Sequence, residues 1–179
     1  MKYGKATISH VVLFCFDFPK MRDFYTNVLG FHLSDSGQAR GNDICFLTLD
    51  PAADHHMLAL AAGRTGSPED KVINHIAFRV ASLPELRKRY AMLKQAGLNG
   101  IEPITHGSWL SVYYRDIENN RLEFFCDMPW YIRQPIVKPL DLSLSDEEIM
   151  RATVEEFGKN PEFKPMSEWK SETLKALDS

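Results

Sequence analysis

The chain contains a diffuse internal repeat, and this repeat limits the folds open to it. The segment ISHVVLF at 8–14 aligns with INHIAFR at 73–79 at an offset of 65 residues, from His10 to His75. The segment FLTLDPAADHHMLAL at 46–60 aligns with VYYRDIENNRLEFFC at 112–126 at an offset of 66, from Asp50 to Asp116. Two segments with nearly equal offsets indicate a duplicated unit, and each copy is too small to bury a core alone. The sequence therefore predicts two similar modules that pack together.

Hydrophobic periodicity predicts the same order of elements in each copy: a strand, a helix, then three strands. In the first copy, a strand at about 7–16 precedes a helix at about 19–29 with Pro19 at its start and Gly30 at its end. In the second copy, Ser82 and Glu85 predict a capping box, and Gly97 ends the helix. Further strands are expected at about 31–35, 43–49, 55–62, 100–105, 109–116 and 121–126. This layout is of the α+β class.

The repeat stops near residue 128, and the composition then changes. We expect a domain at 1–128, with modules at about 6–65 and 70–128, followed by a C-terminal extension at 129–179. Within the extension, Ser145 and Glu148 predict a capping box for a helix at about 146–157. The extension covers the mouth of a pocket, wraps a second subunit, or only supports packing; the sequence leaves these alternatives open.

Charge and cysteine usage exclude several classes of protein. A net charge of −3 with a pI near 6.1 offers no basic surface for nucleic acid or for an anionic membrane. The early apolar stretch VVLFCF is too short for a signal peptide or a membrane span. Three widely spaced cysteines in apolar contexts, Cys15, Cys45 and Cys126, favour buried thiols in a reducing compartment. We therefore expect a cytoplasmic protein without nucleic-acid or membrane partners.

Two histidines and one glutamate form a candidate metal-ligand set. His10, His75 and Glu123 each lie in a short apolar run that predicts a strand, and two imidazoles with one carboxylate are typical ligands of a mononuclear non-haem metal. A lone strand histidine is more often a packed core residue, but the matched positions of His10 and His75 favour ligation. Glu123 needs a partner if it is buried; the alternative is that it faces water from an antiparallel sheet.

The repeat also predicts how many ligands the protein supplies. An offset of 66 carries Glu123 back to Met57, so the first copy offers no carboxylate at the corresponding place. An alignment shift of one residue would place His56 there instead. The direct alignment predicts three protein ligands and open positions, which suits a metal that binds substrate and a second small molecule together.

These features together resemble a known superfamily. Paired βαβββ units, a histidine near the start of each copy and a glutamate before the aromatic end of the last strand look like the vicinal oxygen chelate superfamily, over about residues 6–128. Within it, DHHMLALAA at 54–62 and SVYYRDIENNRLEFF at 111–125 are similar to the catalytic module of type I extradiol catechol dioxygenases. The resemblance implies a cupped mixed sheet around a metal site, followed here by a helical tail. It also implies a homodimer.

The resemblance assigns a role to one residue of a histidine pair. His56 matches a histidine that acts as acid and base near the metal, a task that suits an imidazole with its pKa near about 6.5. His55 is expected to alternate to the other face of the strand that begins with this pair. The alternative for both histidines is a solvated loop after Asp54.

Two further residues are expected in the substrate pocket. Tyr113 stands ten residues before Glu123, the spacing of the active-site tyrosine in the extradiol family, and its phenol is expected to hydrogen-bond a catecholate oxygen. Tyr114 should then face the core. His106 lies seven residues before Tyr113, where some relatives carry another polar residue such as asparagine. It is either a substrate contact or a turn residue beside Gly107.

The resemblance implies an extradiol ring-cleavage dioxygenase that uses O2 and a small catechol-type aromatic diol, similar to 2,3-dihydroxybiphenyl. The expected cofactor is Fe(II), with Mn(II) or another divalent metal as the alternative. The alternative functions are another metal-dependent enzyme of the superfamily, such as a glyoxalase-like isomerase or a thiol transferase, and a non-catalytic small-molecule binding or resistance protein.

Overall fold

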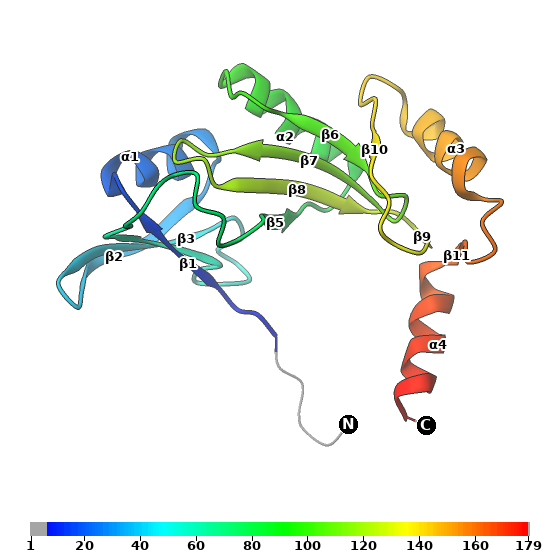
Figure 1. Cartoon of the computed structure of the whole chain (residues 1–179), viewed down its shortest axis with the longest axis horizontal. Coiled ribbons are helices and arrows are strands. Elements are labelled where there is room, and N and C mark those ends of the chain that lie inside the picture. The colour runs from blue at the N-terminus through cyan, green and yellow to red at the C-terminus, as the bar shows by residue number, and fades with distance from the viewer. Residues whose placement is uncertain (1–6, 179) are drawn as a thin grey trace. The chain divides into compact units, whose positions relative to one another are not determined.

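The computed structural model describes residues 7–178, so residue 6, the expected start of the first module, lies outside the described residues (Figure 1). The protein is α+β, as the sequence predicts. The first copy of the repeat contains β1 (Val11–Cys15), α1 (Phe18–Asp23), the π-helical turn η1 (Phe24–Val28), β2 (His32–Ala39), β3 (Asn42–Thr48) and β4 (Leu58–Ala62). The second copy contains β5 (Ile76–Arg79), α2 (Leu83–Gln95), β6 (Glu102–Thr105), β7 (Trp109–Arg115) and β8 (Arg121–Asp127). The extension contains β9 (Trp130–Tyr131), β10 (Lys138–Pro139), α3 (Asp146–Phe157), β11 (Lys164–Pro165) and α4 (Met166–Asp178).

The described chain forms two compact units. The first-repeat unit holds residues 7–74 and the turn 115–120, and the second-repeat unit holds residues 75–114 and 121–178. The first unit contains a four-stranded sheet in the order β1-β4-β3-β2. The second unit contains a five-stranded sheet in the order β10-β6-β7-β8-β5 and a two-stranded sheet of β11 and β9. The C-terminal extension therefore contributes a strand to the same sheet as the second repeat.

Both units pair the first strand of the repeat with its last strand in parallel. Val11 pairs with Leu58 in the first unit, and Ile76 pairs with Leu122 in the second. This equivalence makes Ala59 the counterpart of Glu123, so the sequence alignment of Glu123 with Met57 is wrong. The loop before β4 is longer than the turn before β8, which shifts the offset between the repeats. The first copy still offers no carboxylate at this place.

Side-chain caps fix the starts of the helices. The Ser82 hydroxyl accepts from the Glu85 amide at 3.4 Å, but the Glu85 carboxylate turns to Lys88, so the capping box predicted for α2 is only half formed. The box predicted for α3 is complete: the Ser145 amide donates to the Glu148 carboxylate at 2.8 Å, and the Glu148 amide donates to the Ser145 hydroxyl at 3.2 Å. The predicted bounds of this helix are confirmed.

Buried carboxylates hold the turn 115–120 in the first-repeat unit. Glu118 accepts from the amides of Phe16 at 3.0 Å and Asp17 at 2.8 Å, at the end of β1. Asp116 accepts from the Tyr25 hydroxyl at 3.0 Å, and burial raises the pKa of the Asp116 carboxyl. The hydrogen bonds that each carboxylate accepts replace the ones it would make to water, and they offset the free-energy cost of burying its charge.

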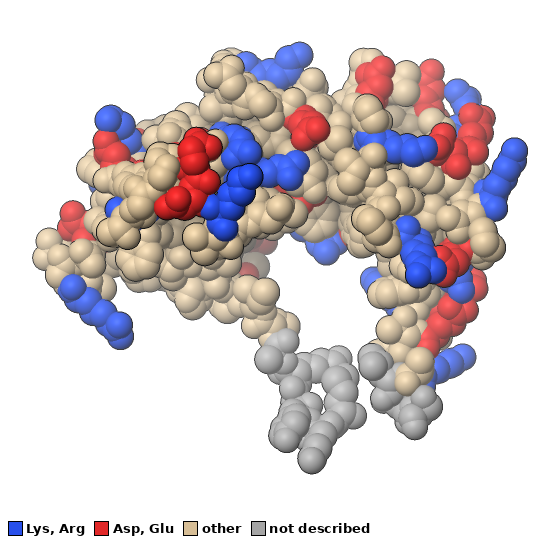
Figure 2. All heavy atoms as spheres, in the orientation of Figure 1, with Lys and Arg blue, Asp and Glu red and all other residues tan. Residues whose placement is uncertain are grey.

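The three cysteines are free thiols and all are buried, as the sequence predicts. Burial raises the pKa of Cys15 to about 12 and that of Cys126 to about 11, so both remain protonated. Within residues 7–178, no helix is long and apolar enough to cross a membrane. Acidic and basic side chains are interspersed over the face drawn in Figure 2.

Candidate functional site

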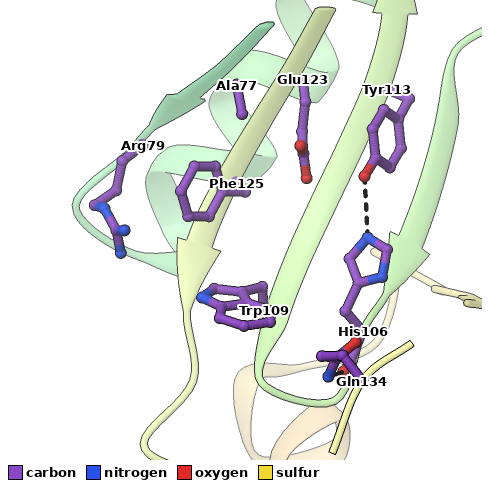
Figure 3. Close-up of a pocket in the computed structure, with 8 residues that line it drawn as sticks. All are labelled: Ala77, Arg79, His106, Trp109, Tyr113, Glu123, Phe125 and Gln134. Atoms are coloured by element: carbon purple, nitrogen blue, oxygen red, sulfur yellow. Dashed lines mark hydrogen bonds between the residues drawn. The ribbon is translucent and has the colours of Figure 1, made fainter. Parts of the chain in front are cut away.

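A cavity of about 360 Å³ in the second-repeat unit is the candidate functional site (Figure 3). Strand alternation places Trp109 and Tyr113 of β7 on one face, beside Glu123 and Phe125 of β8. The cavity therefore has aromatic walls and a polar end. Its lining residues are Ala77, Arg79, His106, Trp109, Tyr113, Glu123, Phe125 and Gln134.

A histidine and a buried carboxylate meet beside this cavity. The Nε2 atom of His75 lies 3.1 Å from the Oε2 atom of Glu123. His75 immediately precedes β5 instead of lying within the predicted strand, and parallel pairing of β5 with β8 brings Ala77 opposite Glu123. The Glu123 side chain is 8% exposed, so it does not face bulk water. An imidazole nitrogen and a carboxylate oxygen at this separation form a donor pair that suits a divalent metal.

Tyr113 lies beside this donor pair and also lines the cavity. Its ring meets the His75 ring edge to face, with centroids 5.4 Å apart. Burial raises the pKa of Tyr113 to about 12, and the negative charge and hydrogen bond of Glu123 add to this shift. The Tyr113 phenol therefore stays protonated at neutral pH and can donate one hydrogen bond.

His106 lies in the turn before Gly107, and its side chain also lines the cavity. Its Nε2 atom lies 3.1 Å from the Tyr113 hydroxyl, as Figure 3 shows. Its Nδ1 atom faces the carbonyl oxygen of Ile136 in the C-terminal extension. Tyr114 is fully buried in the core, as predicted.

The other predicted site residues lie in the first-repeat unit. His10 is exposed and precedes β1 by one residue, the same place that His75 holds before β5. The centroids of the His10 and His56 rings are 4.5 Å apart. Burial, followed by the nearby His10 and His55, lowers the pKa of His56. This shift favours the neutral imidazole that can accept a proton.

Two expectations for the histidine pair are wrong. His55 and His56 lie in the loop before β4, which begins only at Leu58, so the pair does not open a strand. Because strand alternation does not apply in this loop, His55 contacts His56, with 3.0 Å between their Nδ1 atoms. The Nε2 atom of His55 lies 2.9 Å from the Oδ2 atom of Asp35 on β2. Asp35, His55 and His56 thus form a continuous polar chain.

The structure groups His75, Glu123, Tyr113 and His106 in one unit, and His10, His55 and His56 in the other. Over the described ranges, neither unit by itself holds three histidine, cysteine, aspartate or glutamate side chains grouped to bind a metal ion. Sequence reasoning missed Trp109 and Phe125, although two-residue alternation from Tyr113 and Glu123 points to both. Asp35 and Gln134 carry no comparable sequence signal.

Comparisons with known proteins agree with this architecture. Residues 7–124 match the family model of the Glyoxalase/Bleomycin resistance protein/Dioxygenase superfamily. Biphenyl-2,3-diol 1,2-dioxygenase 2 of Rhodococcus globerulus is 32% identical over 157 residues, covering 86% of this chain and 73% of that protein. Biphenyl-2,3-diol 1,2-dioxygenase 3 of the same organism is 33% identical over 125 residues, covering 67% of this chain. The chain spans 63% of the length of this second relative, which is less than two thirds.

Solved structures share the fold at lower identity. A glyoxylase/bleomycin resistance protein/dioxygenase domain from Frankia sp. superposes with a TM-score of 0.60 at 20% identity, covering 70% of this chain and all of that domain. The fosfomycin resistance protein FosX from Listeria monocytogenes superposes with a TM-score of 0.54 at 22% identity, covering 70% of this chain and 96% of that one. The family match and the identity to the first relative show that the chain belongs to the glyoxalase/bleomycin resistance protein/dioxygenase superfamily.

Proposed function

We propose that the protein is a metal-dependent extradiol ring-cleavage dioxygenase acting on a catechol-type diol similar to 2,3-dihydroxybiphenyl. The observation that carries the proposal is an aromatic-walled cavity whose polar end holds the buried Glu123 carboxylate beside His75. The names of the relatives support the same chemistry, since two of them are biphenyl-2,3-diol dioxygenases.

The shape and chemistry of the cavity suit a flat aromatic diol. Trp109 and Phe125 provide apolar surface for ring stacking (Figure 3). Tyr113 and His106 place hydrogen-bonding atoms toward the polar end, where the two diol oxygens would bind. A pocket with mostly apolar walls and a few polar groups is typical of small-molecule sites.

The residues present also fit a divalent metal. We assign Glu123 and His75 as two ligands, because their oxygen and nitrogen atoms already approach to 3.1 Å in a shielded position. His10 is proposed as the third ligand on the strength of the sequence repeat alone. Fe(II) bound by this set, or Mn(II) in its place, would supply the redox chemistry that lets a diol react with dioxygen.

The polar chain in the first-repeat unit supports His56 as the acid and base. A carboxylate only accepts hydrogen bonds, so Asp35 places a proton on the Nε2 atom of His55. In the neutral ring of His55, the Nδ1 atom carries no hydrogen, so it can accept a hydrogen bond from the Nδ1–H group of His56. The Nε2 atom of His56 is left without a proton, as a base requires.

The proposal is tested with anaerobically prepared, iron-loaded protein and a panel of monocyclic and bicyclic catechols. A catechol should bind without being consumed until air is admitted, and then give a yellow, pH-sensitive product with one O2 taken up per catechol. If no catechol triggers oxygen uptake while a hemithioacetal or an epoxide is turned over, the fold serves a different metal chemistry.

A further inference from the structure

The C-terminal extension contacts the loop 105–108, which carries His106. The indole nitrogen of Trp130 donates to the carbonyl oxygen of Gly107 at 3.0 Å, and the amide of Ile132 donates to the Ser108 hydroxyl at 3.0 Å. Further along the extension, β10 pairs with the end of β6, which leads into the loop. The loop is therefore fixed to the extension by both side-chain and backbone hydrogen bonds.

Gly107 shows how closely the two segments approach. Its φ angle of 75° lies in the left-handed region, and a Cβ atom at this position would lie 2.7 Å from the Cγ2 atom of Ile132. Only glycine meets both conditions, so the sequence of the turn is adapted to the extension packed against it.

The extension also determines where the His106 ring carries its proton. The Nδ1 atom of His106 faces the carbonyl oxygen of Ile136, and a carbonyl oxygen only accepts hydrogen bonds. Nδ1 therefore bears the hydrogen. In the neutral ring, the Nε2 atom has no hydrogen and accepts from the Tyr113 hydroxyl at 3.1 Å.

The Gln134 side chain binds the peptide group that precedes the Ile136 carbonyl. The amide nitrogen of Gln134 donates to the carbonyl oxygens of His106 at 2.8 Å and Ile132 at 3.1 Å. Its amide oxygen accepts from the Ile136 backbone amide at 3.0 Å. Gln134 thus links the His106 backbone to the peptide that precedes the Ile136 carbonyl, and this carbonyl accepts a hydrogen bond from the His106 ring. The Gln134 side chain also lines the cavity.

The tautomer of His106 matters because Tyr113 has one proton and two neighbouring acceptors, the Nε2 atom of His106 and the Glu123 carboxylate. If Nε2 carries no hydrogen, it competes with the Glu123 carboxylate to accept the hydrogen bond from the phenol. If Nε2 bears a hydrogen instead, it donates to the phenol oxygen and leaves the phenol proton to Glu123.

We infer that the C-terminal extension is a positioning device for the pocket: Gln134 and the Ile136 carbonyl fix His106 as its Nδ1–H tautomer, and the bare Nε2 atom orients the Tyr113 hydroxyl. Gln134 and His106 are thus positioning residues that act through Tyr113. The inference deepens the proposed function and rests on it for the consequence in catalysis. The tautomer itself is a property of the resting protein and is measured without turnover.

The test reads the side-chain nitrogens of His106 by long-range ¹H–¹⁵N correlation NMR. Full-length protein labelled with ¹⁵N-histidine is kept free of paramagnetic metal, and the His106 signals are assigned by their loss in His106→Gln. The expected result is the Nδ1–H pattern in the wild type and a mixture of tautomers in Gln134→Leu. The matched control is Gln38→Leu, which removes a hydrogen bond to the exposed Asp43 and should leave the His106 pattern unchanged.

An Nε2–H pattern in the wild type would overturn the inference, whether or not the Gln134 variant folds. An unchanged pattern in folded Gln134→Leu would also overturn it.

In turnover, Gln134→Leu should raise KM for a catechol by about 2- to 10-fold, the effect of losing one oriented hydrogen bond, with a smaller change in kcat. His106→Gln retains an amide that can accept from Tyr113, so its KM should lie closer to the wild-type value than that of His106→Leu. Equal KM values for these two variants would contradict the positioning role.

Discussion

The Nε2 atom of His75, one residue before β5, lies 3.1 Å from the Oε2 atom of Glu123 within β8, and these two strands pair in parallel. This separation leads to the first prediction. The wild-type protein should bind one divalent metal per chain, and His75→Ala should lose it with little change in circular dichroism, because only Glu123 and the proposed ligand His10 would remain. Elemental analysis of dialysed protein measures the metal content, with His32→Ala as the control, since His32 is exposed on β2. Stoichiometric metal in His75→Ala would remove His75 from the ligand set.

A second prediction separates proton transfer from metal binding. His56→Ala should retain the metal and bind a catechol, yet lower kcat by roughly 10² to 10⁴, the usual contribution of a positioned acid or base. Metal content, equilibrium binding and single-turnover rates are measured on the same preparation. If the metal is lost together with activity, His56 is a ligand, and the isomerase-like alternative moves ahead.

Tyr113→Phe removes the phenol hydroxyl that interacts with His106 and Glu123 in the cavity. The variant should keep its metal and raise KM for a catechol by about 10-fold, since a hydrogen bond in a shielded site contributes about 1–2 kcal/mol. Oxygen-uptake kinetics give KM and kcat separately. Kinetics identical to the wild type would show that the Tyr113 phenol does not contact the substrate.

The next prediction concerns stability in the first-repeat unit. Glu118→Ala leaves the amides of Phe16 and Asp17 without their acceptor and Arg64 without a close charge partner. Because these groups are largely shielded, the free energy of unfolding should fall by about 2–4 kcal/mol. Urea denaturation measures it, and the exposed Glu155→Ala serves as the control. A loss as small as that of the control would mean that the turn 115–120 is held by other contacts.

The sequence predicts the elements whose signals are local. The α3 helix spans Asp146–Phe157 as expected, because its capping box and apolar stripe are local signals. The sequence predicts the start of β4 too early, because nothing in HHMLAL separates the histidine pair from the apolar run that follows it. In the structure the histidine pair belongs to the preceding loop, where the Ser34 hydroxyl bonds to the His55 carbonyl.

Other features depend on contacts between segments far apart in the sequence. The α4 helix was not among the expected elements; a stacked pair, Tyr131 and Trp169, with ring centroids 4.9 Å apart, joins it to β9. The proton position on His106 is set by the carbonyl of Ile136, thirty residues away. Every residue has a backbone carbonyl, so no residue type could have identified this partner.

The most direct test of the proposed function is the origin of the oxygen atoms in the product. Iron-loaded protein is given a catechol that the panel has shown to be a substrate under an atmosphere of ¹⁸O2, and the product is quenched rapidly and analysed by mass spectrometry. A parallel reaction in H2¹⁸O under ordinary oxygen measures exchange of the new carbonyl with water. The account predicts a ring-opened product that carries both oxygen atoms of one O2 molecule. A product with one labelled atom or none, after correction for exchange, would contradict the assignment as a dioxygenase.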